Sequence, residues 1–266
     1  MAACAEAGYG GLSLFGPKVP NGREEEFADL LRRSGVDIAL VTPGLAGPLR
    51  DPFYQGPSAV DERIELICAE IDRLAPFGSK TLALITGSPD SSLPDDGRPA
   101  LVNALRTISD HAGSHGMSVT VEPIANAMFI SLIHTPAEAV QLIREVNREN
   151  LGMLIDISNA NLWTNEQLLI DIDRFRDNIL AVQVADWRAV PRCIMDRALP
   201  GEGVADFPAI LARLEGAGFQ GWYDLEVFSD DGIWGTALED SLLLLPEAEM
   251  LAKARQSFEA VWPGHI

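Results

Sequence analysis

The fold of this chain is decided by four stretches, SVTVEP (118–123), LGMLID (151–156), ILAVQVAD (179–186) and GWYDLEVF (221–228). Each stretch is a short apolar run of the kind that forms a buried strand, and a helical pattern separates each run from the next. Each carries a polar side chain at or near its end: Glu122, Asp156, Gln183 and Glu226. Because the carboxyl ends of parallel strands gather on one face, these side chains predict a metal or catalytic site.

The rest of the chain continues the alternation of apolar runs and helices. Further strands are predicted at 11–16, 36–44 and 80–87. Helices are predicted at 23–35, 61–78, 99–116, 136–149, 165–176, 207–217 and 246–262. Asp61 and Thr135 resemble helix starts, whereas Gly35, Gly78 and Gly116 resemble helix stops. No linker or change of composition divides the 266 residues, so we expect one α/β domain over residues 1–266.

Alternating strands and helices build either a (β/α) barrel or a doubly wound sheet. A dinucleotide-binding sheet would carry GxGxxG after its first strand, and a P-loop would carry GxxxxGK[ST]. Neither motif occurs in the sequence. Polar residues at many successive strand ends instead favour a barrel, in which every loop that follows a strand faces the same mouth.

Composition and charge exclude several classes of partner. The formal net charge of −19 argues against nucleic acid and against anionic membranes, since both are bound through clustered Lys and Arg. No apolar run is long enough to span a membrane, and the N-terminus lacks the pattern of a signal peptide. The three cysteines are odd in number and far apart, which predicts a reducing cytoplasm and no disulfide framework.

Taken together, these segments resemble the xylose isomerase-like TIM barrels of the sugar phosphate isomerase/epimerase group. That family places Glu, Asp, His and a second Glu on its fifth to eighth strands as ligands of one divalent metal. The resemblance therefore implies a ligand set of Glu122, Asp156, Gln183 and Glu226. The most specific stretch is DRALPGEGVADFPAILARLEGAGFQGWYDLE (196–226), because the family often carries R-x-x-P-G-x-G before its last strand.

Two side chains depart from the family pattern. Gln183 stands where the family usually has His, so the ligands become all oxygen, which favours Mn²⁺ or Mg²⁺ over Zn²⁺ or Co²⁺. Asn159 stands where many relatives have a substrate-binding His; it can hydrogen-bond a hydroxyl but cannot titrate near neutral pH.

The start of the chain is a third departure. MAACAEAGYGGLSLFGP (1–17) resembles the end of the family's first helix running into its second strand. Counting back from Glu226 leaves about seven strands, with the first strand and most of the first helix absent. We expect either a start codon upstream or a barrel that closes in another way, and translation of the upstream DNA distinguishes the two.

The resemblance implies chemistry on a sugar or polyol. A metal would polarise a carbonyl group, and Glu122 and Glu226 would act as base and acid through an enediolate. Isomerisation, epimerisation and dehydration can all start from this intermediate. Arg197 is the candidate for binding a substrate hydroxyl, carboxylate or phosphate, and Trp187 could pack against a sugar face. Asp186 is expected to support the site, as an acceptor or as a partner of Arg188 or Arg197.

Other functions and residues remain open at this point. A dehydratase acting on an inosose or dehydroshikimate, or a barrel that binds a sugar without turning it over, would fit the same scaffold. An endonuclease of the endonuclease IV type needs many histidines and a basic face, which four histidines and this acidity disfavour. His111 and His115 have the helical spacing of a metal pair, but their place at a helix end favours solvated side chains. Trp234 either lines the pocket or covers the rim, and a homodimer is compatible with the family.

Overall fold

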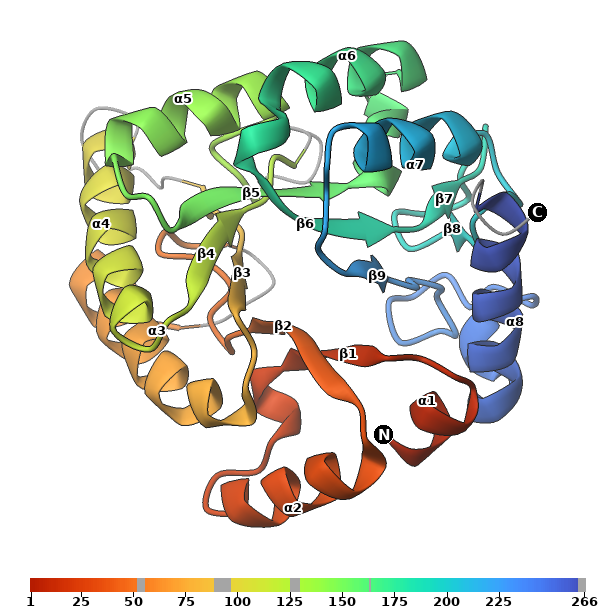
Figure 1. The fold of residues 1–266 in the computed structure, drawn as a ribbon, viewed down its shortest axis with the longest axis horizontal. Helices are drawn as coiled ribbons and strands as arrows, with labels where there is room; N and C mark the ends of the chain where they lie inside the picture. The colour runs from red at the N-terminus through yellow and green to blue at the C-terminus, as the bar shows by residue number, and fades with distance from the viewer. Residues whose placement is uncertain (52–55, 89–96, 125–129, 163, 263–266) are drawn as a thin grey trace. The chain divides into compact units, whose positions relative to one another are not determined.

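A computed structural model describes residues 1–51, 56–88, 97–124, 130–162 and 164–262 of this α/β protein (Figure 1). The helices are α1 (Ala2–Glu6), α2 (Glu24–Ser34), α3 (Val60–Leu74), α4 (Arg98–Ser114), α5 (Pro136–Val146), α6 (Asn165–Phe175), α7 (Phe207–Gly216) and α8 (Glu247–Val261). The strands are β1 (Gly11–Phe15), β2 (Asp37–Thr42), β3 (Thr81–Leu84), β4 (Ser118–Val121), β5 (Leu151–Asp156), β6 (Ile179–Val184), β7 (Asp186–Trp187), β8 (Arg197–Ala198) and β9 (Tyr223–Leu225). Short 3₁₀ turns are η1 (Gly16–Lys18), η2 (Ala75–Phe77), η5 (Ile157–Leu162), η6 (Arg176–Asn178) and η7 (Leu242–Leu244).

Seven strands form one sheet in the order β1-β2-β3-β4-β5-β6-β9, and its pairs β1–β2, β2–β3, β3–β4, β4–β5 and β6–β9 are parallel. Neighbours in the sheet therefore follow one another along the chain, as the colours of Figure 1 show. A doubly wound sheet would reverse its strand order at a switch point, whereas a (β/α) barrel keeps one direction throughout. The α/β class and the seven predicted strands are confirmed. The exception to chain order is the hairpin β7–β8, which lies inside a segment predicted as a loop.

The contacts divide the chain into two compact units. The N-terminal unit comprises residues 11–155 and 177–181, and the C-terminal unit comprises residues 1–10, 156–176 and 182–266. In the N-terminal unit, Leu40, Ala83, Leu154 and Ala181 form one buried cluster from four strands. In the C-terminal unit, Leu199, Leu242 and Ala254 form another. Each unit thus has an apolar core of its own, and the single-domain organisation stays a prediction.

Several helix boundaries follow from local sequence. Thr135 caps α5 through a reciprocal capping box with Glu138, and Pro136 occupies the first turn, where its missing N–H costs nothing. Gly35 ends α2 with φ of 67°, a left-handed conformation that favours glycine. Asp61 departs from the prediction, because α3 begins at Val60 and Asp61 lies within its first turn. No described helix is both long enough and apolar enough to cross a membrane.

The loop after β2 is fixed by a buried arginine. The Arg63 side chain, on α3, is 1% exposed and donates from Nε and Nη2 to the Gly47 carbonyl oxygen at 3.0 and 2.8 Å. Its Nη2 also lies 3.5 Å from the Asp51 carboxylate, whose side chain is fully buried. A Cβ atom at Gly47 would lie 2.7 Å from the Ile85 carbonyl oxygen, so the loop lies tightly against the end of β3.

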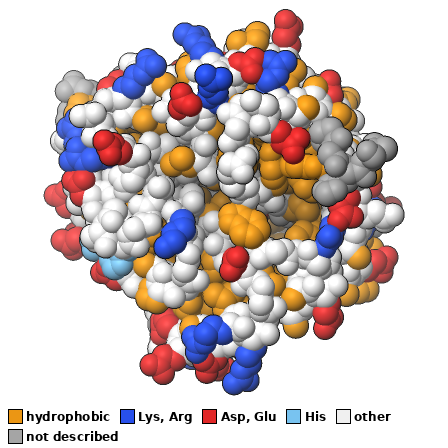
Figure 2. Space-filling model, viewed as in Figure 1, with side chains coloured by type: hydrophobic (Ala, Val, Ile, Leu, Met, Phe, Trp, Pro, Cys, Tyr) orange, Lys and Arg blue, Asp and Glu red, His pale blue; other side chains and the backbone are white. Residues whose placement is uncertain are grey.

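The surface carries charges of both signs. On the face drawn in Figure 2, acidic and basic side chains are interspersed over the described part of the chain. The excess of 39 acidic over 20 basic residues therefore does not gather there into one acidic field. Charges distributed in this way mainly keep a protein dispersed in water.

Candidate metal and substrate site

Four of the predicted site residues meet in the C-terminal unit. Asp156 ends β5, Gln183 lies in β6, Arg197 begins β8, and Glu226 directly follows β9. Strands β6 and β9 pair in parallel, with Gln183 opposite Asp224, and the Glu226 N–H donates to the Val184 carbonyl oxygen at 3.2 Å. The strand register therefore places the amide and the carboxylate next to each other.

Arg197 holds two of the predicted ligands together. Its Nη1 donates to Glu226 Oε2 at 2.6 Å, and its Nη2 lies 3.0 Å from Asp156 Oδ2. The guanidinium carbon also lies 4.6 Å from the centre of the Phe228 ring, a cation–π contact that holds the planar group in place. A forked cation thus bridges two carboxylates that come from different strands.

Asp156 is oriented by the turn that follows it. Its carboxylate is fully buried and accepts hydrogen bonds from the Ser158 N–H to Oδ1 at 2.9 Å and from the Ser158 hydroxyl to Oδ2 at 2.8 Å. Ser158 and Arg197 thus supply hydrogen bonds and a counter-charge to a carboxylate that lies out of water.

The amide nitrogen of Gln183 has hydrogen-bond partners, whereas its amide oxygen has none among the described residues. Its Nε2 donates to Glu226 Oε1 at 3.1 Å and reaches Asp224 Oδ2 at 3.4 Å. Its Oε1 is buried and has no hydrogen-bond partner among the residues that the structure describes. An unpaired buried oxygen costs free energy, so a donor or a cation bound at this oxygen would stabilise the site.

The electrostatics of the site centre on Glu226. Burial, followed by the charges of Asp156 and Asp224, raises the pKa of Glu226 to about 7, although Arg197 opposes the shift. Three carboxylates against one guanidinium leave the cluster short of positive charge.

The donor set fits a hard divalent cation. Asp156 and Glu226 offer carboxylate oxygens, and Gln183 offers the unpaired amide oxygen. Oxygen ligands of this kind suit Mg²⁺ or Mn²⁺. Both carboxylates also bind Arg197, so a cation would compete with the guanidinium for them.

Asp186 organises the loop that carries R-x-x-P-G-x-G. Its fully buried carboxylate accepts four backbone N–H groups, from Trp187, Gly201, Gly203 and Ala205, at 2.8 to 3.0 Å. Arg188, considered as its partner from the sequence, instead pairs with Asp196 at 3.0 Å. The carboxylate thereby holds residues 201–205 against the β7–β8 hairpin.

We expect Gly203→Ala to disrupt this loop. A Cβ atom at Gly203 would lie 2.2 Å from the Trp187 carbonyl oxygen and 2.4 Å from Asp186 Oδ1. Moving the backbone to relieve these contacts costs free energy. The free energy of unfolding should fall by about 1–3 kcal/mol, the usual cost of overpacking. Gly216→Ala is the matched control, because a Cβ atom there meets nothing within 4 Å and alanine favours the helix. Equal unfolding midpoints in urea for the two variants would contradict the expectation.

The remaining predicted residues are placed as follows. Trp187 faces Arg197 across the antiparallel β7–β8 pair, so cross-strand geometry brings the two side chains to the same side. Asn159 is buried in η5, three residues beyond Asp156. Glu122 belongs to the N-terminal unit, where it directly follows β4 and its N–H donates to the Leu84 carbonyl oxygen at 3.0 Å.

Three residues that contact the site were not predicted from the sequence. Asp224 and Phe228 lie two residues before and two residues after Glu226, and alternate residues of a strand point to the same face, which is the signal that could have found them. Ser158 follows Asp156 by two residues, a spacing typical of a turn in which an Asp side chain accepts a backbone N–H.

Two further side chains, Trp234 and His134, lie beside residues that are close to them in the chain. His134 Nδ1 donates to the Ile124 carbonyl oxygen, 2.9 Å away, and the backbone N–H of His134 donates to Glu138. Trp234 is 55% exposed and its N–H donates to Asp230, whose buried carboxylate also accepts from Gly232 and Thr236. His265 lies outside the described residues.

The fold matches a known family. A family model described as the xylose isomerase-like TIM barrel covers residues 1–254, and the chain belongs to this family. A solved structure described as the IOLI protein with a bound zinc atom aligns over 99% of this chain and 92% of its own, with a TM-score of 0.78 and 17% identity. The predicted barrel fold is confirmed.

The curated relatives that the chain resembles carry the names of enzymes. A 3-dehydroshikimate dehydratase of Pseudomonas putida is 24% identical over 86% of this chain and 36% of its own length. A 2-oxo-tetronate isomerase of Pectobacterium atrosepticum is 25% identical over 84% of this chain and 83% of its own. Other relatives are named inosose isomerase, inosose dehydratase and ketose 3-epimerase. The chain spans 36% of the dehydratase and 46% of one inosose isomerase from Bacillus subtilis.

Proposed function

We propose that this protein is a divalent-metal-dependent isomerase or epimerase of a sugar or of a carbonyl compound derived from a polyol. The observation that carries the proposal is the cluster in which Arg197 bridges Asp156 and Glu226 beside the unpaired Gln183 oxygen. Names among the relatives, which include isomerases and an epimerase, support the same reaction class.

The metal would be held by Asp156, Gln183 and Glu226, with Glu122 as the fourth ligand inferred from the order of the strands. When bound, a divalent cation supplies Lewis acidity that makes the hydrogen next to a carbonyl group more acidic. We favour Mn²⁺ or Mg²⁺ because every donor is an oxygen.

The chain's own residues would move the proton and orient the substrate. Glu226, whose ionised form is disfavoured by burial, would exchange a proton with the carbon next to the carbonyl group, and Glu122 would serve as the second acid or base. Arg197 would donate to a substrate oxygen with its fork, and Trp187, beside it on the hairpin, would cover the sugar face. Asn159 would hydrogen-bond a hydroxyl group.

A dehydratase is the second candidate. The Pseudomonas putida relative that carries this name matches 86% of the chain, and an inosose dehydratase matches 65%. A lyase needs the same proton abstraction and then an acid that protonates the departing hydroxyl. The two reactions therefore differ in the product rather than in the first step.

We also propose the compartment, the partner and the oligomeric state of the protein. The three described cysteines are free, which suits the reducing cytoplasm. A small neutral sugar or polyol is the proposed partner. A homodimer fits the family.

The test is solvent exchange on a panel of ketoses, inososes and 3-dehydroshikimate, with Mn²⁺ in deuterated water. An isomerase or epimerase incorporates deuterium at the carbon next to the carbonyl group and returns a saturated product. A dehydratase yields an unsaturated or deoxy-keto product. Binding of a panel member without exchange would point to a sugar-binding barrel and overturn the catalytic proposal.

Removal of Arg197 should separate metal binding from catalysis. Arg197→Met removes the guanidinium group that pairs with both Asp156 and Glu226. We therefore expect Mn²⁺ to bind at least about tenfold more tightly, because roughly 1.4 kcal/mol of repulsion between the two cations is relieved. Substrate KM should rise at the same time. Arg197→Lys keeps the charge but not the fork, so its Mn²⁺ affinity should stay near that of the wild type. Calorimetric titration that finds weaker Mn²⁺ binding in Arg197→Met would contradict this account.

A further inference from the structure

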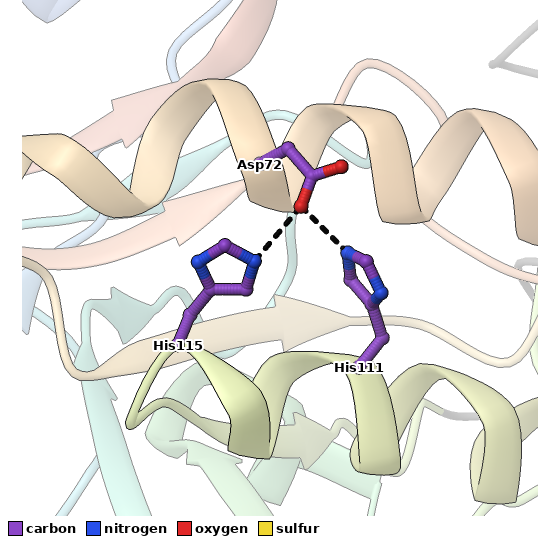
Figure 3. Close-up of side chains that lie close together, drawn as sticks. All are labelled: Asp72, His111 and His115. Carbon is purple, nitrogen blue, oxygen red and sulfur yellow. Dashed lines mark hydrogen bonds and ion pairs between the residues drawn. The ribbon is translucent and has the colours of Figure 1, made fainter.

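A second cluster of ligand-type side chains lies in the N-terminal unit, where α3 packs against α4. Both histidines reach the same oxygen atom: His111 Nε2 lies 2.7 Å from Asp72 Oδ1, and His115 Nε2 lies 2.8 Å from it (Figure 3). The three ligand atoms all lie within 4.8 Å of one another. Two imidazoles and a carboxylate converging on one point are the donor set of many transition-metal sites.

The backbone explains why the two rings converge. His111 lies in the last turn of α4, and His115 is the residue that directly follows the helix; the centroids of their rings lie 5.4 Å apart. Asp72 stands in the last turn of α3, opposite them. Two of the three donors therefore come from regular helices, and the third comes from the residue that ends α4.

The electrostatics at this point favour a cation. A helix C-terminus carries partial negative charge, and both α3 and α4 end here. The Asp72 carboxylate thus lies beside two negative helix ends, where a bound cation is favoured.

The cluster is also open to water. The Asp72 side chain is 56% exposed and each histidine side chain is 32% exposed. An ion could enter without unfolding the helices, and water could complete its coordination.

We propose that Asp72, His111 and His115 form a surface site for a transition-metal dication of the Zn²⁺ or Cu²⁺ type. The two Nε2 atoms and one Asp72 oxygen would be the ligands, with each imidazole neutral and carrying its proton on Nδ1. Tetrahedral ligation at about 2.0–2.1 Å places ligand atoms roughly 3.3 Å apart, so the two separations between Asp72 Oδ1 and the imidazole nitrogens, 2.7 and 2.8 Å, need to open only slightly. The site is independent of the proposed function, because its ligands, its unit and its preferred ions all differ.

Metal stoichiometry tests the site directly. The full-length protein is dialysed against Zn²⁺, together with the double variant His111→Gln/His115→Gln and the control His134→Gln. We expect the double variant to bind one equivalent less than the wild type, and the control to match the wild type. Equal stoichiometry in all three proteins would overturn the proposal. Asp72→Asn, which keeps both imidazoles, should bind Zn²⁺ more weakly and guards against a folding defect in the double variant.

Spectroscopy distinguishes this site from the one at Glu226. Asp156, Gln183 and Glu226 offer side-chain oxygen, whereas His111 and His115 offer nitrogen. Electron paramagnetic resonance of the Cu²⁺-loaded wild type, with modulation from the remote imidazole nitrogens, should report two imidazoles. That signature should disappear in His111→Gln/His115→Gln and persist in His134→Gln. A wild-type spectrum without imidazole coupling would show that the cluster is only a hydrogen-bonded clip between two helices.

Discussion

Glu226→Gln should lower kcat by about 10²–10⁴-fold, the usual contribution of a positioned proton-transfer group. The substitution keeps the size of the side chain but removes the carboxylate that binds Arg197 at 2.6 Å and would hold the metal. Mn²⁺ content after reloading should also fall well below one equivalent, since one of the few oxygen ligands with a charge is lost. The rate is measured on whichever panel substrate the wild-type protein turns over.

Glu202→Gln is the matched control for this experiment. Glu202 lies in the same unit, in the loop after Arg197, and its side chain is 42% exposed beside Lys253. Removal of that charge should leave the rate and the Mn²⁺ content unchanged. If Glu226→Gln retained both wild-type Mn²⁺ content and wild-type deuterium exchange, the cluster around Arg197 would not be the reaction site.

The fold could be predicted from the sequence because its signals are local and repeated. Short apolar runs such as LGMLID become strands whose residues are all buried, and the capping box at Thr135 starts its helix where expected. The hairpin β7–β8 was missed because each strand is two residues long, too short for any alternation to register. The start of α3 was predicted at Asp61, but the helix begins at Val60. No side-chain cap marks that start.

The candidate site was predictable in its residue types but not in its contacts. The positions of Asp156, Gln183 and Glu226 follow from strand ends, whereas the bridge made by Arg197 depends on a hairpin that brings residue 197 back beside β7. Which of several carboxylates pairs with an arginine depends on the three-dimensional fold, so it does not follow from the sequence alone. The same holds for Asp186, whose four backbone partners lie up to 19 residues away in the chain.

Arg63→Met should produce the largest loss of stability among these variants. Arg63 is buried with Asp51, and breaking a buried ion pair from one side costs about 3–5 kcal/mol, because the Asp51 carboxylate then stays buried without the Arg63 charge. The Gly47 carbonyl oxygen also loses both donors that hold the loop after β2. The free energy of unfolding, measured by urea denaturation, should fall by that amount. Coincident unfolding curves from fluorescence and circular dichroism would establish that unfolding is two-state, which the comparison of free energies requires.

Two further variants show whether the burial of this ion pair is the cause. Arg213→Met removes an arginine that pairs with Asp173 at the surface, where the side chains are 43% and 54% exposed, and should cost about 0–1 kcal/mol. Arg63→Met/Asp51→Asn removes both charges and should regain part of the loss, because a neutral amide then replaces the buried carboxylate. A loss in Arg63→Met no greater than in Arg213→Met would mean that the loop is held by its close packing against β3 rather than by the charge. The Gly47 contact with the Ile85 carbonyl oxygen would then be the feature to vary next, through Gly47→Ala.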